Sequence, residues 1–149
     1  MNTLERVGPL AGRLLIAFIF VFAGLGKIMG FHGTVGYIAS KGLPFPELAA
    51  LAAIAVAVGG GLMVMLGWKT RWAAAAMLIF TGMAAAIFND FWAAAPAQAQ
   101  DQMIHFMKNV SMMGGLLYVV VYGAGPLSLE ARRAARVTVH RQGITGAAS

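Results

Sequence analysis

The chain has 149 residues, of which 60% are hydrophobic and only 11% charged, and it carries a net charge of +6 and no cysteine. A soluble domain carries about 25% charged residues, so this chain has too few polar side chains to cover a water-soluble globule. The positive charge is therefore interpreted as a membrane-topology signal rather than as a nucleic-acid-binding surface. The lack of cysteine excludes disulfides and thiolate chemistry, and the histidines lack metal-ligand spacing, so no metal site is predicted.

A helix that crosses a bilayer needs roughly 20 mostly apolar residues. Four segments meet this requirement, at about residues 10–31, 47–68, 72–92 and 103–122. The stretch HGTVGYIASKGLPFPE between the first two is interpreted as a Gly- and Pro-rich loop, and AAAPAQAQDQ joins the last two. The predicted fold class is all-α: a polytopic membrane four-helix bundle over residues 1–129, followed by a basic tail over residues 130–149 that is partly disordered.

The basic residues predict the orientation of the bundle. Eight of the eleven Lys and Arg residues fall on one side of the predicted spans: Arg6, Arg13, Lys69, Arg71, Arg132, Arg133, Arg136 and Arg141. Because basic residues collect on the cytoplasmic side, both termini are predicted to be cytoplasmic. The arginines of the tail could then lie along anionic lipid headgroups as a short interfacial helix.

Small residues repeat every four positions along the second predicted span, at Ala49, Ala53, Ala57 and Gly61. A stripe of this kind lets a neighbouring membrane helix approach closely. The competing interpretation is that alanine is merely common in this chain.

Every predicted span carries polar groups near its outer end. They are Lys27 with His32 just beyond the first span, Glu47 on the second, Asn89, Asp90 and Trp92 on the third, and His105, Lys108 and Asn109 on the fourth. Charges at this depth are costly unless they are paired, hydrated or turned into the bundle. Pairing of Lys27 and Lys108 with Glu47 and Asp90 would leave the layer neutral. We therefore predict a polar site in the outer half of the bundle.

Each of these residues also has a purely structural interpretation. Lys27, Lys108 and Arg13 could extend to the membrane surface, and Glu47 could stabilise a helix start after Pro46. His105 could be a packing residue. Asp90 is the least easily dismissed, because an aspartate between large aromatic residues gains little from lipid.

Five stretches together resemble the DoxX family of small bacterial four-helix inner-membrane proteins. They are GRLLIAFIFVFAGLGKIMGF, YIASKGLPFP, VGGGLMVMLGWKTRWAA, FNDFW and HFMKNVSMMGGLL, and the resemblance runs from about residue 12 to residue 129. It implies a bacterial inner-membrane location. It further implies a link to redox systems, because the family is named after a small subunit of a thiosulfate:quinone oxidoreductase, and other members resemble partners of oxidative-stress and thiol-handling enzymes.

Carried over by position, the resemblance implies roles for Lys27, Asp90, Lys108 and Asn109. This chain departs from the pattern at Asn89, where many relatives have histidine. It departs again at Val56 and Ala57, where many place an acidic residue. Both departures bear on any proton relay assigned from the family.

The leading hypothesis is a redox-associated membrane subunit that binds a quinone or a sulfur oxyanion. The predicted catalytic residues are Asp90, Lys108, Lys27 and His105, and the predicted ligand-binding residues are Asn89, Asn109, Glu47, Trp92 and His32. Without cysteine or paired histidines, electrons would come from a bound organic cofactor, a quinone being the candidate, or from a partner protein. The alternatives are a non-catalytic binding or assembly module and, ranked last, a small transporter; homo-oligomerisation is compatible with each.

Overall fold

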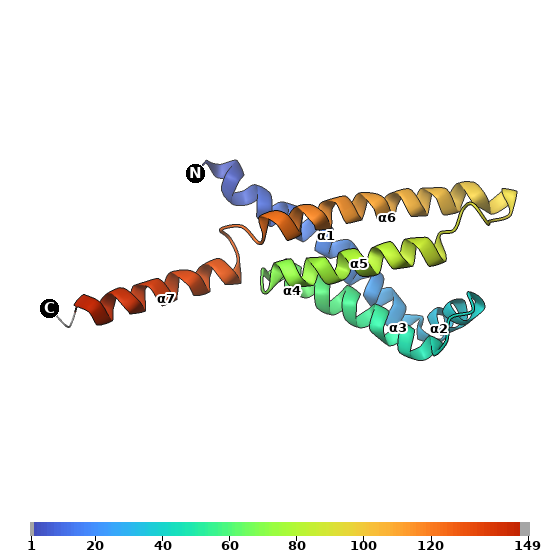
Figure 1. Cartoon of the computed structure of the whole chain (residues 1–149), viewed down its shortest axis with the longest axis horizontal. Helices are drawn as coiled ribbons and strands as arrows, with labels where there is room; N and C mark the ends of the chain where they lie inside the picture. Colours follow the sequence, from blue (N-terminus) through green and yellow to red (C-terminus); the bar gives the residue numbers. More distant parts are fainter. Residues whose placement is uncertain (1, 147–149) are drawn as a thin grey trace.

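The computed structural model describes the backbone of residues 2–146 and the side chains of residues 2–138. Within that part of the chain every regular element is a helix, which confirms the all-α prediction (Figure 1). In chain order these are α1 (Thr3–Met29), α2 (Phe31–Ser40), α3 (Pro46–Ile54), the π-helix η1 (Ala55–Gly60), α4 (Gly61–Leu66), α5 (Thr70–Phe88), α6 (Pro96–Tyr122) and α7 (Leu129–Gly146).

Four helical stretches are long and apolar enough to cross a membrane: Thr3–Met29, Pro46–Leu66, Thr70–Phe88 and Pro96–Tyr122. The predicted number of spans is confirmed, and α3, η1 and α4 together make the second one. Both described ends of the chain lie at one end of the bundle, and α2 lies at the other (Figure 1). We call these the α7 end and the α2 end. Which end faces the cytoplasm stays a prediction.

Two span boundaries differ from the predicted ones for local reasons. The first helix begins at Thr3 rather than near residue 10, because Asn2 and Glu5 form a capping box with two hydrogen bonds of 2.9 Å. The third span ends at Phe88 rather than at residue 92, because Asn89 leaves helical geometry with φ −119° and ψ 48°. Asp90 therefore follows the helix instead of lying inside it.

The segment between the first two spans was predicted as a loop, and this prediction is wrong for the ten residues that form α2. Isolated helices this short are marginal in water, so α2 depends on tertiary contacts. Ile38 is buried, and the Tyr37 hydroxyl donates a hydrogen bond of 3.2 Å to the main-chain oxygen of Phe88. The chain then turns at Gly42, whose φ of 74° suits glycine.

Two residues of the small-residue stripe on the second span, Ala57 and Gly61, pack closely against α1. A Cβ atom on Gly61 would lie 3.4 Å from the main-chain oxygen of Ala17, and one on Gly24 would lie 3.2 Å from the Cβ of Ala57. This close approach coincides with η1, where the helix is wider than an ordinary α-helix. Such π-helical segments are rare and are frequently found at functional sites.

Arg13 was expected to extend toward the membrane surface, but the structure buries it with only 2% of its surface exposed. Its Nη2 donates a hydrogen bond of 2.7 Å to the main-chain oxygen of Leu127, in the connection that leads to α7. Nearby, Glu130 accepts a hydrogen bond of 2.8 Å from the main-chain N–H of Thr70. Arg13 and Glu130 therefore fasten the chain between α6 and α7 to the α7 end of the bundle.

Beyond these contacts, α7 leaves the bundle and continues away from it (Figure 1). The predicted basic tail is helical through Gly146. The predicted disorder of residues 147–149 lies outside the described residues. The side chains of Arg132, Arg133 and Arg136 are exposed on α7, and their contact with lipid headgroups stays a prediction.

Candidate functional site

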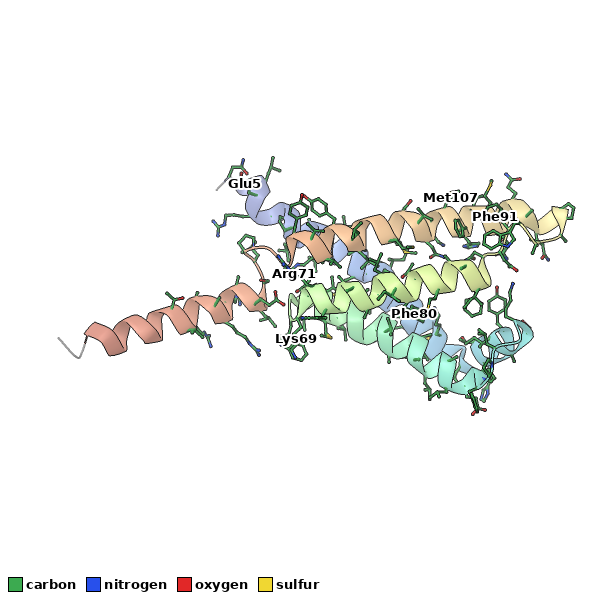
Figure 2. The ribbon with its side chains drawn as sticks, in the orientation of Figure 1. Glu5, Lys69, Arg71, Phe80, Phe91 and Met107 are labelled. Atoms are coloured by element: carbon green, nitrogen blue, oxygen red, sulfur yellow. The ribbon has the colours of Figure 1, made fainter. Side chains whose placement is uncertain are left out.

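A cavity of about 330 Å³ lies at the α2 end of the bundle. All four spans and α2 contribute to its wall. Its lining residues are Ile19, Phe20, Ala23 and Lys27 from α1, Thr34, Tyr37 and Ile38 from α2, Ala53 and Ala57 from the second span, Phe80, Thr81, Ala84, Phe88 and Asn89 from α5 and its C-cap, and Lys108, Asn109 and Met112 from α6. In Figure 2, Phe80 marks the part of α5 that borders the cavity.

A second and larger cavity, of about 710 Å³, lies toward the α7 end between the first half of α1 and the last turns of α6. The main buried cluster includes Ala17, Val64, Met77 and Leu116, each with no exposed surface. Close packing of these small and medium side chains holds the spans together. Of these two cavities, the one at the α2 end is taken as the candidate site because predicted site residues line it.

α1 and α6 cross near the middle of the bundle. The two helices touch where Ile16 meets Gly115, since a Cβ atom on Gly115 would lie 2.8 Å from the Ile16 Cδ1. From this crossing they diverge toward the α2 end (Figure 1). α6 packs chiefly against α5, and its Lys108 is exposed while Lys27 of α1 is half-buried. At the α2 end α1 and α6 are therefore further apart than at their crossing, and residues of both helices line the cavity.

Four of the nine predicted site residues meet in this cavity: Lys27, Asn89, Lys108 and Asn109. Among the described side chains, those of Lys27, Asn89 and Asn109 form no hydrogen bond with another residue, so their N–H groups are free to meet a ligand. The hydroxyl of Thr81, by contrast, donates to the main-chain oxygen of Met77 at 2.7 Å. The cavity therefore offers hydrogen-bond donors on an otherwise apolar and aromatic wall.

Asp90 does not line the cavity, and the predicted pairing of this carboxylate with Lys27 or Lys108 is wrong. Its Oδ1 atom lies 2.8 Å from the Nζ atom of Lys41, which follows α2. The hydrogen bond from Lys41 lowers the pKa of Asp90 below its ordinary value, and the same contact raises the pKa of Lys41. Asp90 thus ties the α2–α3 connection to the end of α5, directly beside the cavity residue Asn89.

His105 lies outside the cavity wall and contacts two charged neighbours on α6. Its Nδ1 is 3.3 Å from the Nζ of Lys108, and its Nε2 is 3.6 Å from the Oδ2 of Asp101. Because an ammonium group can only donate, Nδ1 accepts from Lys108, and the hydrogen of a neutral imidazole lies on Nε2, facing Asp101. Lys108 is therefore oriented by His105 at the edge of the cavity.

The remaining three predicted residues lie apart from the cavity. Glu47 is exposed in the first turn of α3, after Pro46, where it favours the helix start. Trp92 is 61% exposed and packs edge-on against Phe91 and Phe106. His32 is exposed and lies beside Phe31. Figure 2 places Phe91 in the connection between α5 and α6.

Sequence reasoning missed Tyr37 and Lys41. Both lie in the stretch that was interpreted as a loop, although their spacing of four residues is typical of one helix face. Tyr37 lines the cavity, and its ring packs against Phe88 with centroids 5.5 Å apart. A helical interpretation of this stretch would have placed both residues on one face of the same short helix.

No three His, Asp or Glu side chains in the described part of the chain gather closely enough to hold a metal ion. The cavity itself presents ammonium and amide donors facing aromatic rings. It can bind oxygen acceptors or negative charge on a molecule that also has an apolar body.

The fold and the cavity define an integral membrane protein with four helical spans and a cavity between them. The chain belongs to the DoxX family, because residues 8–90 match the family model for DoxX. That match covers the first three spans and ends at Asp90, and it confirms the resemblance drawn from the sequence motifs.

Curated relatives extend the similarity to nearly the whole chain. Inner membrane protein YphA of Escherichia coli (strain K12) is 37% identical over 123 residues, covering 83% of this chain and 88% of the relative. Inner membrane protein YqjF of the same strain is 35% identical over 130 residues, covering 87% and 95%. The predicted location in the inner membrane is thus confirmed.

A more distant relative is the Surfeit locus protein 4 homolog of Schizosaccharomyces pombe, 28% identical over 127 residues, which are 83% of this chain but 37% of that protein. No solved structure matches the chain significantly.

Proposed function

We propose that this DoxX protein is a membrane component of a redox system and that its cavity binds a quinone-type head group. The observation that carries the proposal is the set of donors on an apolar wall: Lys27 from α1, Asn89 after α5, and Lys108 and Asn109 from α6. Ligand pockets usually combine a predominantly apolar lining with a few convergent polar groups, and their volumes start at about 300 Å³.

Both the carbonyl oxygens and the flat ring of a quinone have suitable partners in the cavity. Quinone carbonyl oxygens accept hydrogen bonds, which Lys27 and Lys108 can donate with the added strength of a charged donor. The aromatic rings of Phe20, Phe80 and Phe88 offer an apolar surface for the flat ring system. Because the cavity lies among membrane-spanning helices, a lipid-soluble molecule would reach it from the bilayer.

When bound, a quinone supplies the capacity to take up two electrons and two protons. This chain's own part would be to bind and orient the ring and to hold positive charge beside its oxygens. The contact of Lys108 with His105, and of His105 with Asp101, leads from the cavity edge to the surface of α6. Electrons would come from a redox partner protein.

Binding tests this proposal most directly. Purified protein in lipid nanodiscs would be titrated with a short-chain ubiquinone and with menadione, and co-purified quinone would be sought by extraction and mass spectrometry. Lys27→Met and Lys108→Met should each weaken binding by roughly tenfold or more, because each removes a charged hydrogen bond worth about 1.5–3 kcal/mol. Lys69→Met is the matched control, since Lys69 lies in the turn before α5, at the α7 end, and should change nothing.

A protein that carries no quinone and binds none of the added ones would refute the proposal. Weakening by the Lys69 variant equal to that of the cavity variants would refute the location of the site. Circular dichroism of each variant shows whether the helical bundle is retained.

A second candidate is an assembly module, and one observation favours it. The Lys41–Asp90 ion pair and the Tyr37 hydrogen bond both fasten α2 to α5, as a structural lock would. Asp90→Asn and Lys108→Met separate the two functions. If both variants lose expression or fold, the polar residues are a lock. If the bundle stays intact and quinone binding is lost in the Lys108 variant, they form a site.

A further inference from the structure

The charge of the cavity is unbalanced. Lys27 and Lys108 line it, whereas its lining includes no aspartate or glutamate among the described residues. Two ammonium groups held at one end of a membrane bundle without a counter-charge are costly, since burial removes hydration and like charges repel each other.

The chain has five acidic residues, all within its described part, and each is placed elsewhere. Glu5 caps α1, and Glu130 accepts from the main-chain N–H of Thr70; both are at the α7 end. Asp90 is paired with Lys41, Asp101 faces His105, and Glu47 is exposed at the start of α3. No carboxylate of this chain therefore lines the cavity or pairs with its two lysines. The His105 contact with Lys108 adds no negative charge, because a histidine ring is either neutral or positively charged.

Resting on the proposed function, and narrowing it to one ligand class, we infer that the cavity binds a flat organic anion whose charged oxygens lie between Lys27 and Lys108. The negative charge supplies what the protein lacks, and Asn109, next to Lys108 on the same wall, offers an amide N–H to the same end of the ligand. The acidic hydroxyquinones, which ionise to enolates, and two-ring aromatic carboxylic acids belong to this class.

Size and lining narrow the class further. Inorganic oxyanions would satisfy the lysines but leave most of a 330 Å³ cavity and its phenylalanine wall without a partner. A neutral quinone would fill the apolar part and leave the two positive charges uncompensated. Only a molecule with an acidic group on an aromatic body matches both features.

The test compares two ligands of nearly equal shape. The first is 2-hydroxy-1,4-naphthoquinone, whose hydroxyl group is ionised at neutral pH, and the second is its neutral methyl ether, 2-methoxy-1,4-naphthoquinone. Binding to the full-length protein is measured by titration calorimetry in phosphatidylcholine nanodiscs, and empty nanodiscs correct for partitioning into lipid. The anion should bind at least tenfold more tightly, because charge-assisted hydrogen bonds are roughly twice as strong as neutral ones.

Lysine variants locate the origin of that preference. The double variant Lys27→Met/Lys108→Met should bind both ligands with equal affinity, and Lys69→Met should keep the full preference. If the double variant does not fold, the single Lys108→Met change at the exposed lysine serves instead and should reduce the preference several-fold.

Each result bears on a different claim. Equal binding of the two ligands to the unaltered protein overturns the inference and leaves the proposed quinone site standing. A preference for the anion that survives removal of the lysines also overturns it. Failure of both ligands and of the short-chain quinones to bind removes the proposed function as well.

Discussion

Replacing Gly24 by alanine would test the helix packing that shapes the cavity wall. A Cβ atom at this position would lie 2.5 Å from the Cγ2 of Val58, 3.2 Å from the Cβ of Ala57 and 3.3 Å from the main-chain nitrogen of Val58. Carbon atoms pack best about 3.5–4.0 Å apart, so α1 would have to move away from η1. Overpacking of this kind costs about 1–3 kcal/mol, against about 0.5–1 kcal/mol gained when alanine replaces glycine inside a helix.

Gly26→Ala is the matched control, because Gly26 lies two residues further along α1 and a Cβ atom there would meet no neighbouring atom within 4 Å. The Gly26 variant should gain the helix stability that alanine brings without the cost of overpacking. It should therefore be more stable than the Gly24 variant by the overpacking cost, about 1–3 kcal/mol. Thermal unfolding followed by circular dichroism in one detergent measures the difference. The Gly24 variant should also bind quinone less well, since Ala57 lines the cavity. Equal stability of the two variants would refute the close approach of α1 to η1.

Three further changes follow from the contacts described above. Tyr37→Phe keeps the ring but removes its hydrogen bond, so about 1 kcal/mol of stability should be lost, and hydrogen exchange should become faster in α2. Asp90→Asn should lower the melting temperature only where the Lys41 pair is fully charged. The pKa of Asp90 is lowered in the folded protein, so the ion pair stabilises the fold above the ordinary pKa of aspartate, and this stabilisation is lost as the pH falls through the folded-state pKa of Asp90. The pKa of Lys41 is raised, so the stabilisation is also lost as the pH rises through the folded-state pKa of Lys41. The effect should therefore be greatest between about pH 4 and about pH 10. Arg13→Ala removes the charged hydrogen bond to Leu127, so proteolysis between α6 and α7 should become faster and about 1.5–3 kcal/mol should be lost.

Each of these predictions can be contradicted by a simple comparison. Unchanged exchange in α2 of the Tyr37 variant would mean that its hydroxyl does not hold the helix. A constant difference in melting temperature across the whole pH range would show that Asp90 acts without its charge. For Arg13, lysine at the same position keeps the charge but not the planar donor geometry, so full protection from proteolysis in that variant would argue against the hydrogen bond.

The number and type of elements follow from the sequence because the bilayer is a strict solvent. A run of about 20 apolar residues has no alternative to a membrane-spanning helix, since unpaired backbone groups are too costly in lipid. The stripe of Ala53, Ala57 and Gly61 likewise predicts a close helix contact, because small side chains are what such a contact requires. Hydropathy and residue spacing are local properties of the chain, so the spans and the small-residue contact could be predicted from the sequence.

Only about half of the candidate site could be predicted, because the direction of each side chain depends on packing between distant segments. Lys27 and Lys108 were expected at one depth, because position along a span sets the depth of a side chain, and both line the cavity. Whether a side chain at that depth faces the cavity, a neighbouring helix or lipid depends on the rotation of its helix and on which loop packs nearby. Lys41 pairs with Asp90 only because α2 folds against the end of α5, a contact between segments 49 residues apart in the chain.

The sequence by itself thus determined four membrane helices, their small-residue contact and a polar layer near one end. The tertiary structure alone decided that Glu47 and Asp90 lie outside the cavity and that Lys27 and Lys108 line it. The physical reason is that an ion pair outside the spans requires less loss of hydration than one between them. Asp90 lies just past the end of α5, and it pairs there with Lys41, in the connection after α2, rather than with the lysines between the spans.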